Sequence, residues 1–271
     1  MPRIHPGPSL AILLVVALID PRQVARGDEF AIAWQRVEER TLALSTKYSI
    51  KVIVVKEAME SAGTNYAIAP VEKYSSHLSI LEKEIEIYPI DFLKKIGLKK
   101  IILCGGITLY GNHYGGYTER LMGNVVYDVA REYPDPKTRL ADSRLTFHHE
   151  LFHVLDDQIH FDRSSRFYSD PQWKALNPPG FLYHNLGGPK PDRIGLDSST
   201  PGFLTGYSRY SINEDKAEVF AWKITRPNVI DERARIDKIL EKKSRHLEAV
   251  ISRFAPEIDG RFWAERQKNS E

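Results

Sequence analysis

Two histidines and a glutamate stand where they could bind one metal ion and use it. They form the segment His149-Glu150-x-x-His153. Histidines four residues apart lie on one face of an α-helix, so both imidazoles can reach a single zinc ion. Glu150, about 100° around the helix from His149, can act on a metal-bound water instead of ligating the metal. Because chance produces this pattern on the order of a few per cent of the time in such a chain, its surroundings have to support it.

The helix that carries this motif is expected over residues 138–160 and has two different faces. Its core face is apolar and consists of Leu151, Phe152, Leu155 and Ile159. His148 lies among them and is expected to be a hydrogen-bonded core histidine. His149, His153 and Asp156 share a separate polar stripe. Buried imidazoles need partners, and a metal would supply one.

Two histidines leave a zinc site incomplete, because catalytic sites normally have a third protein ligand and an open position. A third histidine after the helix would stand ten residues beyond His149, but that position is Ile159. His160 misses by one residue, and Asp156 stands where the three-histidine pattern needs a glycine. The three-histidine arrangement therefore fails.

Glu214 is the better candidate for the third ligand. In the helix expected over residues 213–225, Glu214 and Glu218 are one turn apart, and the small Ala217 would let this helix approach the motif helix closely. Glu214 would ligate the metal, and Glu218 would accept the free ring N–H of a ligand histidine. Two structural alternatives remain open: Ser211-x-x-Glu214 also fits a capping box, and the charged turn could be solvated.

Tyr207 is the candidate donor for an oxyanion. It lies seven residues before Glu214, in a loop with glycine and serine that would pass over the metal. Its phenol could hydrogen-bond the oxyanion as a tetrahedral intermediate forms. Tyr210 is the fallback for this role, and a plain packing role is the alternative in a chain with 13 tyrosines.

Together these residues resemble the catalytic domain of anthrax lethal factor and the related Pro-Pro endopeptidases, which are gluzincin-type zinc metallopeptidases. The resemblance covers roughly residues 138–225 and is carried by His149-Glu150-x-x-His153-x-x-Asp156-Asp157, Tyr207 and Glu214-x-x-Ala217-Glu218-x-Phe220. The chain departs from its relatives at the bulky Phe152, where they often have glycine, and in the insert between the two helices. These departures bear on substrate specificity more than on chemistry.

The resemblance implies a Zn²⁺ cofactor and a role for each matching residue. His149, His153 and Glu214 match the zinc ligands, Glu150 the general base, Tyr207 the transition-state tyrosine and Glu218 the acid that orients a ligand histidine. The expected reaction is hydrolysis of a peptide bond by a zinc-activated water that Glu150 deprotonates. The peptide would lie extended along an edge strand, for which residues 123–129 are the best candidate.

The elements that must position these residues predict an α+β fold of the zincin type. We expect a small mixed sheet packed on the active-site helix and a mostly helical C-terminal lobe. Helices are expected over residues 30–46, 71–98 (interrupted at Pro89), 138–160, 213–225 and 231–254, and strands over 48–55, 101–104, 107–110 and 123–129. Residues 111–117 are expected to be a turn-rich loop. Residues 161–206 are expected to be irregular, as a lid or a specificity loop.

The N-terminus reads as a signal peptide over residues 1–27. Leu10 to Ile19 is an unbroken apolar run, too short to span a bilayer but suited to a signal core. Ala25-Arg26-Gly27 offers the small residues that cleavage prefers, so the protein is expected to be secreted or periplasmic. A short buried helix or an uncleaved anchor is the alternative. The metallopeptidase domain would then be residues 28–271, with an α/β part over 28–137 and the zinc site and helical lobe over 138–271.

Composition limits the partners. The chain has 271 residues, 42% of them hydrophobic, and its 38 basic and 36 acidic residues give a net charge of +2. This balance shows no basic excess that would favour nucleic acid or an anionic membrane surface, so we expect no nucleic-acid partner and no stable membrane association after signal cleavage. The expected protein or peptide substrate is what the resemblance implies. Cys104 is the only cysteine, so an intrachain disulfide is excluded, and a buried thiol is expected.

Two other functions share these residues. One is a non-catalytic secreted protein that keeps a zinc site for stability or has lost turnover, although the intact Glu150 and a candidate tyrosine argue against such decay. The other is a zinc hydrolase of non-peptide amides, which would use every residue named above. The sequence leaves the substrate, the cleavage preference and the oligomeric state open.

Overall fold

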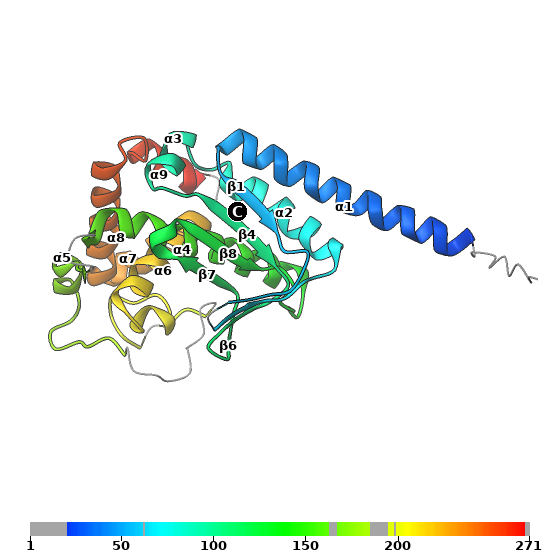
Figure 1. Cartoon of the computed structure of the whole chain (residues 1–271). Coiled ribbons are helices and arrows are strands. Elements are labelled where there is room, and N and C mark those ends of the chain that lie inside the picture. Colours follow the sequence, from blue (N-terminus) through cyan, green and yellow to red (C-terminus); the bar gives the residue numbers. More distant parts are fainter. Residues whose placement is uncertain (1–20, 62, 163–166, 185–194, 198, 269–271) are drawn as a thin grey trace, which may run out of the picture.

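The computed structural model describes residues 21–61, 63–162, 167–184, 195–197 and 199–268. Its helices and strands confirm the α+β class (Figure 1). The helices are α1 (Pro21–Tyr48), α2 (Val71–Ile85), α3 (Ile90–Lys95), α4 (Pro136–His160), α5 (Pro171–Ala175), α6 (Ile212–Thr225), α7 (Pro227–Ile236), α8 (Lys238–Phe254), α9 (Gly260–Lys268) and the 3-10 turns η1 (Arg120–Met122) and η2 (Tyr207–Arg209). The strands are β1 (Lys51–Val54), β2 (Met59–Ser61), β3 (Thr64–Tyr66), β4 (Lys100–Cys104), β5 (Ile107–Leu109), β6 (Asn112–Tyr114), β7 (Gly116–Glu119), β8 (Asn124–Asp128), β9 (Phe161–Asp162) and β10 (Phe167–Tyr168).

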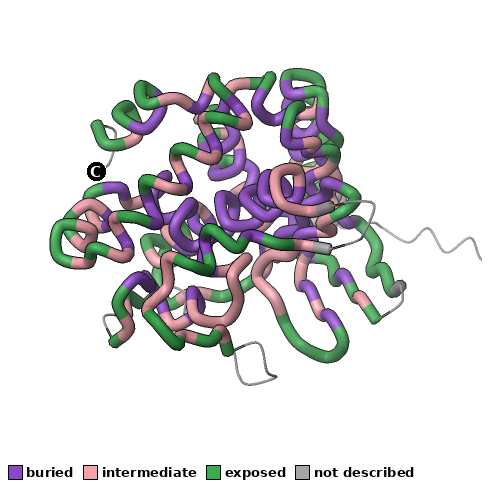
Figure 2. The backbone as a smooth tube through the Cα atoms, turned by 90° about the vertical axis from the view of Figure 1, so that its left-hand side faces the viewer, coloured by how far each residue is buried: buried purple, intermediate pink, exposed green. Residues whose placement is uncertain are grey.

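The central sheet is buried on both faces. Its strand order is β1-β4-β8-β7, with β1, β4 and β8 parallel and β7 antiparallel to β8. Ile101, Leu103 and Val125 belong to the main core with the helices, whereas Cys104 and Val126 pack with the second sheet, β2-β3-β5-β6. Strands that are buried on both sides have continuous apolar sequences. Cys104 is a buried, free thiol, as predicted from the sequence. Figure 2 shows the buried segments gathered inside the molecule.

The loop predicted over residues 111–117 is wrong. The strand predicted over 123–129 is confirmed as β8, but its predicted place at the edge of the sheet is wrong. Tyr110 (φ 48°) and Gly111 (φ 81°) form a two-residue turn that joins β5 to β6. Positive φ at both positions suits a hairpin of this kind. β7 follows at once and takes the edge of the central sheet, so β8 lies inside it, between β4 and β7.

The C-terminal lobe has one more break and one more helix than expected. The helix predicted over 231–254 is two helices, α7 and α8, because Asp237 adopts an extended backbone and caps α8, accepting bonds from the N–H groups of Ile239 and Leu240 at 3.0 Å. Aspartate is a favoured N-cap residue. α9 was not predicted. The helix predicted over 213–225 is α6, and Arg226-Pro227 ends it as expected.

α1 extends well beyond the body of the molecule at its N-terminal end (Figure 1). The apolar run Leu10–Ile19 lies outside the described residues, and residues 21–27 belong to α1, which continues past the predicted cleavage site. The signal peptide therefore stays a prediction. None of the helices in the described ranges combines the length and the apolar character that crossing a membrane requires.

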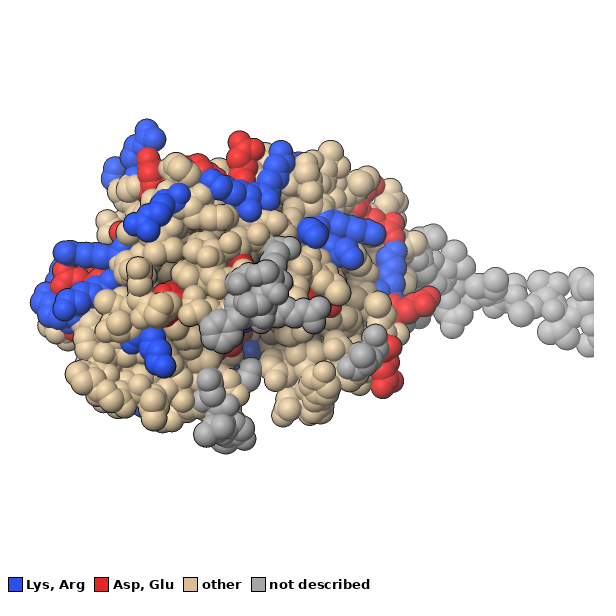
Figure 3. Space-filling model, turned by 60° about the vertical axis from the view of Figure 1, so that its left-hand side comes forward, with Lys and Arg blue, Asp and Glu red and all other residues tan. Residues whose placement is uncertain are grey.

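Charges are mixed on the surface. On the face drawn in Figure 3, lysine and arginine side chains are interspersed with aspartate and glutamate, as the balanced composition predicts. The segment predicted as irregular, 161–206, contains β9, β10 and α5 in its described part, and its role as a lid or specificity loop stays a prediction.

A buried lysine joins α6 to α4. The Nζ atom of Lys216, on α6, bonds Asp156 on α4, lies 2.9 Å from Asp170 Oδ2 and donates to the Tyr168 hydroxyl at 2.8 Å. Tyr168 in turn donates to Asp156 Oδ2 at 2.6 Å. Lys216 is 1% exposed and Asp156 is fully buried. This ionic cluster holds together the two helices that carry the candidate metal ligands.

Lys216→Ala is expected to cost about 3–5 kcal/mol of the free energy of unfolding, because it leaves the carboxylates of Asp156 and Asp170 buried without their cation. Urea unfolding at neutral pH measures this loss. The same substitution at Lys47, whose ion pair with Glu86 is exposed, should change stability little. Equal losses in the two variants would contradict a structural role for Lys216.

The decrease in the free energy of unfolding caused by Lys216→Ala should depend on pH. Burial raises the pKa of Asp156, but Lys216 and His160 outweigh burial and hold that pKa well below its ordinary value. A carboxyl group whose pKa is lower in the folded than in the unfolded protein stabilises the fold at any pH above its unfolded-state pKa, which is about 3.9 for aspartate. This stabilisation is lost as the pH falls through the folded-state pKa. The gap between wild type and Lys216→Ala should therefore narrow on acidification below about pH 4.

Candidate metal centre

Three ligand atoms from two helices converge. His149 and His153 come from α4, and Glu214 comes from α6. His149 Nε2 lies 2.8 Å from Glu214 Oε2 and 3.1 Å from His153 Nε2, and His153 Nε2 lies 3.4 Å from Glu214 Oε2. Zn–N and Zn–O bonds of about 2.0–2.1 Å in a tetrahedron put ligand atoms about 3.3 Å apart. The three residues therefore fit a single zinc ion.

Close packing of α4 and α6 makes this convergence possible. Ala217 and Ala221 on α6 are fully buried, so small side chains permit the approach. Ser211 caps α6 by accepting the Glu214 N–H at 3.3 Å, as the capping alternative required. The Glu214 side chain, however, is directed to the histidines instead of solvent. Capping by Ser211 and metal binding by Glu214 are therefore compatible.

Hydrogen bonds prepare His149 to be a ligand. Its Nδ1 lies 2.9 Å from Glu218 Oε1, and Thr205 donates to the other Glu218 oxygen at 2.9 Å. An Nδ1–H that donates to Glu218 puts the unprotonated ring nitrogen at Nε2, the atom that lies toward Glu214 and His153 and could bind a metal. His153 differs, because its Nδ1 is buried and has no hydrogen-bond partner among the described residues.

Glu214 is held in its charged form. Burial raises the pKa of Glu214, but the neighbouring His153 and His149 outweigh burial and bring that pKa well below its ordinary value. Two imidazoles and an ionised carboxylate make the nitrogen and oxygen donor set that zinc accepts.

Glu150 lies beside the three ligand residues and takes no part in their cluster. It lines the same cavity of about 140 Å³ as His149, His153 and Glu214. Glu150 is 5% exposed, and its carboxylate accepts a hydrogen bond from Thr118 Oγ1 at 2.7 Å. This position suits a group that acts on a water molecule in the cavity.

Tyr207 also lines this cavity, in η2. It is 6% exposed, and its ring centroid lies 5.8 Å from that of His149. Tyr210 stacks on Tyr207 with centroids 6.1 Å apart. The geometry therefore favours Tyr207 over Tyr210 as the residue that could reach a bound substrate.

His148 is a core residue, as predicted. It is fully buried, its Nδ1 lies 2.6 Å from the Tyr88 hydroxyl, and its Nε2 lies 2.8 Å from Glu84 Oε2. Asp156, the third member of the predicted polar stripe, pairs with Lys216 and His160 away from the ligand cluster. The stripe thus serves two purposes, a candidate metal site and an internal ionic cluster.

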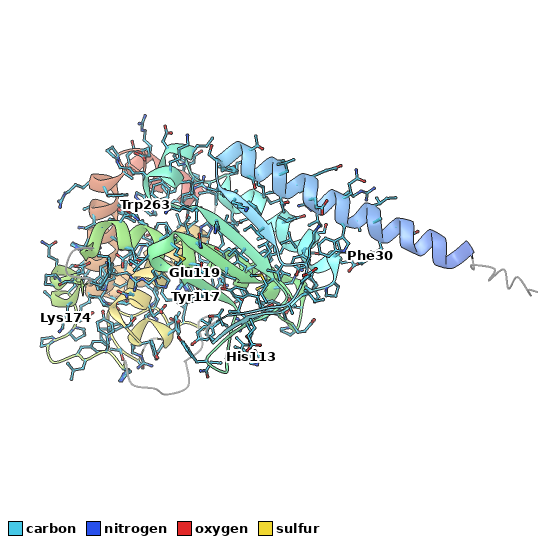
Figure 4. All side chains as sticks on the ribbon, viewed as in Figure 1. Phe30, His113, Tyr117, Glu119, Lys174 and Trp263 are labelled. Atoms are coloured by element: carbon cyan, nitrogen blue, oxygen red, sulfur yellow. The ribbon has the colours of Figure 1, made fainter. Side chains whose placement is uncertain are left out.

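Sequence reasoning missed the residues that β6, β7 and η1 bring to the cavity. These are Tyr114, Gly116, Tyr117, Thr118 and Arg120, to which α6 adds Asn213. Figure 4 shows Tyr117 and Glu119 along β7. The one available signal was the period-two alternation of small and large residues from 116 to 119, which indicates a strand.

Comparison with known proteins gives a family match and a similar solved structure. Residues 44–253 match the model of a protein family described as "Putative zinc-binding metallo-peptidase". A crystal structure of a protein with the same description, from Bacteroides caccae, is similar to this chain with a TM-score of 0.49 and 16% sequence identity, covering 89% of this chain and 95% of the other. No curated protein gives a significant match.

Proposed function

Because this chain belongs to the zinc-binding metallo-peptidase family whose model its residues 44–253 match, we propose that it is an endopeptidase in which Glu150 is the general base for peptide-bond hydrolysis. The observation that carries this proposal is the convergence of His149, His153 and Glu214 beside Glu150 in one cavity. The resemblance to lethal factor and the Pro-Pro endopeptidases, with its gluzincin ligand set and zincin-type fold, is part of this proposal.

His149, His153 and Glu214 would hold the zinc ion, which when bound supplies the Lewis acidity that activates water and polarises a carbonyl. Glu150 takes the proton of the attacking water and passes it to the leaving amine. Tyr207 donates a hydrogen bond to the oxyanion of the tetrahedral intermediate. Glu218 orients His149 through its Nδ1–H. Export of the enzyme, through residues 1–27, also remains a proposal.

Purified protein tested on a peptide library, with and without a zinc chelator, decides between this function and the others. We expect cleavage that the chelator stops and added Zn²⁺ restores. Zinc-loaded protein that cleaves no peptide would overturn the proposal and favour a non-catalytic zinc protein. Hydrolysis restricted to non-peptide amides would favour an amidohydrolase.

Tyr207→Phe is expected to lower kcat by about 10²–10³-fold, because it removes a hydrogen-bond donor to the developing oxyanion. Steady-state kinetics on a peptide from the library measure this change. The matched control is Tyr210→Phe, which removes the same hydroxyl from the ring stacked on Tyr207 and should leave kcat close to wild type. If Tyr210→Phe is the slower enzyme, the two tyrosines have been assigned in the wrong order.

A further inference from the structure

β7 presents one face to α4, and that face reaches the candidate general base. Successive residues of a strand face opposite sides, so positions 116 and 118 of β7 face the same side. On that side Thr118 Oγ1 lies 2.7 Å from Glu150 Oε2 and 3.0 Å from the Glu150 backbone carbonyl oxygen. The other face of β7 carries Glu119, which accepts hydrogen bonds from Tyr66 and Asn124.

The bond from Thr118 to the carboxylate is the stronger of its two contacts. A threonine hydroxyl has one proton to donate, the carboxylate oxygen is the closer acceptor, and hydrogen bonds to an ionised acceptor are shorter and stronger than neutral ones. Thr118 and Glu150 are each 5% exposed, so little water competes with this bond. Among the described residues, Thr118 is the hydrogen-bond donor to this carboxylate.

Gly116 allows the strand to come this close. A Cβ atom built on Gly116 would lie 2.5 Å from Thr146 Cγ2, 2.9 Å from Glu150 Cγ and 3.1 Å from Glu150 Oε1. A side chain at residue 116 would therefore push the strand or the carboxylate away. The missing side chain at 116 and the hydroxyl at 118 thus act on the same glutamate from neighbouring positions of one strand face.

We propose that Thr118 is a positioning residue, which fixes Oε2 of Glu150 and leaves Oε1 as the oxygen that receives the proton of the reacting water. This inference rests on the proposed function. By this inference β7, the edge strand of the sheet, takes part in catalysis and does not only line the cavity. Effective general base catalysis requires such a fixed geometry, because the base must lie within hydrogen-bond reach of the proton it abstracts.

Two substitutions at residue 118 test the role of the hydroxyl. Thr118→Val keeps the branched shape and removes the donor, whereas Thr118→Ser keeps the donor. We expect Thr118→Val to lower kcat by up to about 100-fold, the size of loss that a small misplacement of a catalytic group can cause. KM and zinc content should stay unchanged, and Thr118→Ser should restore most of the activity.

Thr146→Val is the matched control. Thr146 faces Gly116 from α4 and is 3% exposed, and its hydroxyl has no hydrogen-bond partner among the described residues. The control therefore makes the same chemical change at a similarly buried site without touching the Glu150 carboxylate. It should keep the kcat of the wild type. An equal loss of kcat in Thr118→Val and Thr146→Val would show a general packing effect and overturn the proposal.

Crystal structures of wild type, Thr118→Val and Thr118→Ser give a readout that does not depend on turnover. We expect the Glu150 carboxylate to shift or to occupy several conformers in Thr118→Val and to stay in place in Thr118→Ser. If the wild-type protein cleaves no peptide, the proposed function fails, and these structures alone decide whether Thr118 positions Glu150. An unchanged carboxylate in Thr118→Val, or undiminished kcat in that variant, would overturn the inference.

Discussion

Replacing Glu150 with glutamine is expected to lower kcat by about 10²–10⁴-fold, the contribution of a general base, while zinc stays bound. Glutamine has the shape of glutamate but cannot take up the proton of a water molecule. Glu150 hydrogen-bonds Thr118 and is not part of the three-residue ligand cluster, so its loss should spare the metal. Kinetics on a cleaved peptide, together with the zinc content of the same sample, measure both effects.

Glu119→Gln is the control for this variant. Glu119 lies on β7, next to Thr118, but its carboxylate accepts hydrogen bonds from Tyr66 and Asn124 and does not line the cavity. The same substitution there should leave kcat nearly unchanged. Full activity in Glu150→Gln would remove Glu150 as the base, and loss of zinc from that variant would show that Glu150 helps to hold the metal.

Glu214→Gln is expected to weaken zinc binding more than Glu218→Gln does. Glu214 supplies a ligand atom, whereas Glu218 acts only through the Nδ1–H of His149. Loss of such an outer partner typically costs about 10- to 100-fold in metal affinity, so we expect Glu218→Gln within that range and Glu214→Gln beyond it. Competition with a chromophoric chelator measures the two affinities.

Which of the two variants binds zinc more weakly identifies the glutamate that ligates the metal. The two glutamates lie one helical turn apart on α6 and both approach His149, so a general disturbance of α6 would affect zinc binding equally in both. The reverse order would make Glu218 the ligand. Wild-type affinity in Glu214→Gln would show that the metal is held without this carboxylate.

The helical part of the site could be predicted from the sequence because its pattern is local. The 3.6-residue period placed His149 and His153 on one face and His148 in the core, and both placements agree with the structure. The choice of Glu214 followed from a second local pattern and from the need for a third ligand. Helices bring i and i+4 together whatever their tertiary neighbours are.

The strand part of the site could not be predicted in the same way. Whether β7 or β8 takes the edge of the sheet depends on pairing between distant segments, and the glycines and tyrosines of residues 111–117 favour a turn when they are considered locally. Thr118 reaches the Glu150 carboxylate only because β7 packs against α4 in the fold. Lys216 is similar, since a lysine in a helix is ordinarily solvated, and only the packed fold brings Asp156 and Asp170 to it.

A crystal structure measured at the zinc absorption edge would test the shared metal site most directly. We expect one anomalous peak within about 2.0–2.2 Å of His149 Nε2, His153 Nε2 and a Glu214 carboxylate oxygen, with Glu150 outside the coordination sphere. A zinc-loaded crystal with no peak there, or with Glu214 turned away from a metal held by the two histidines, would contradict this assignment.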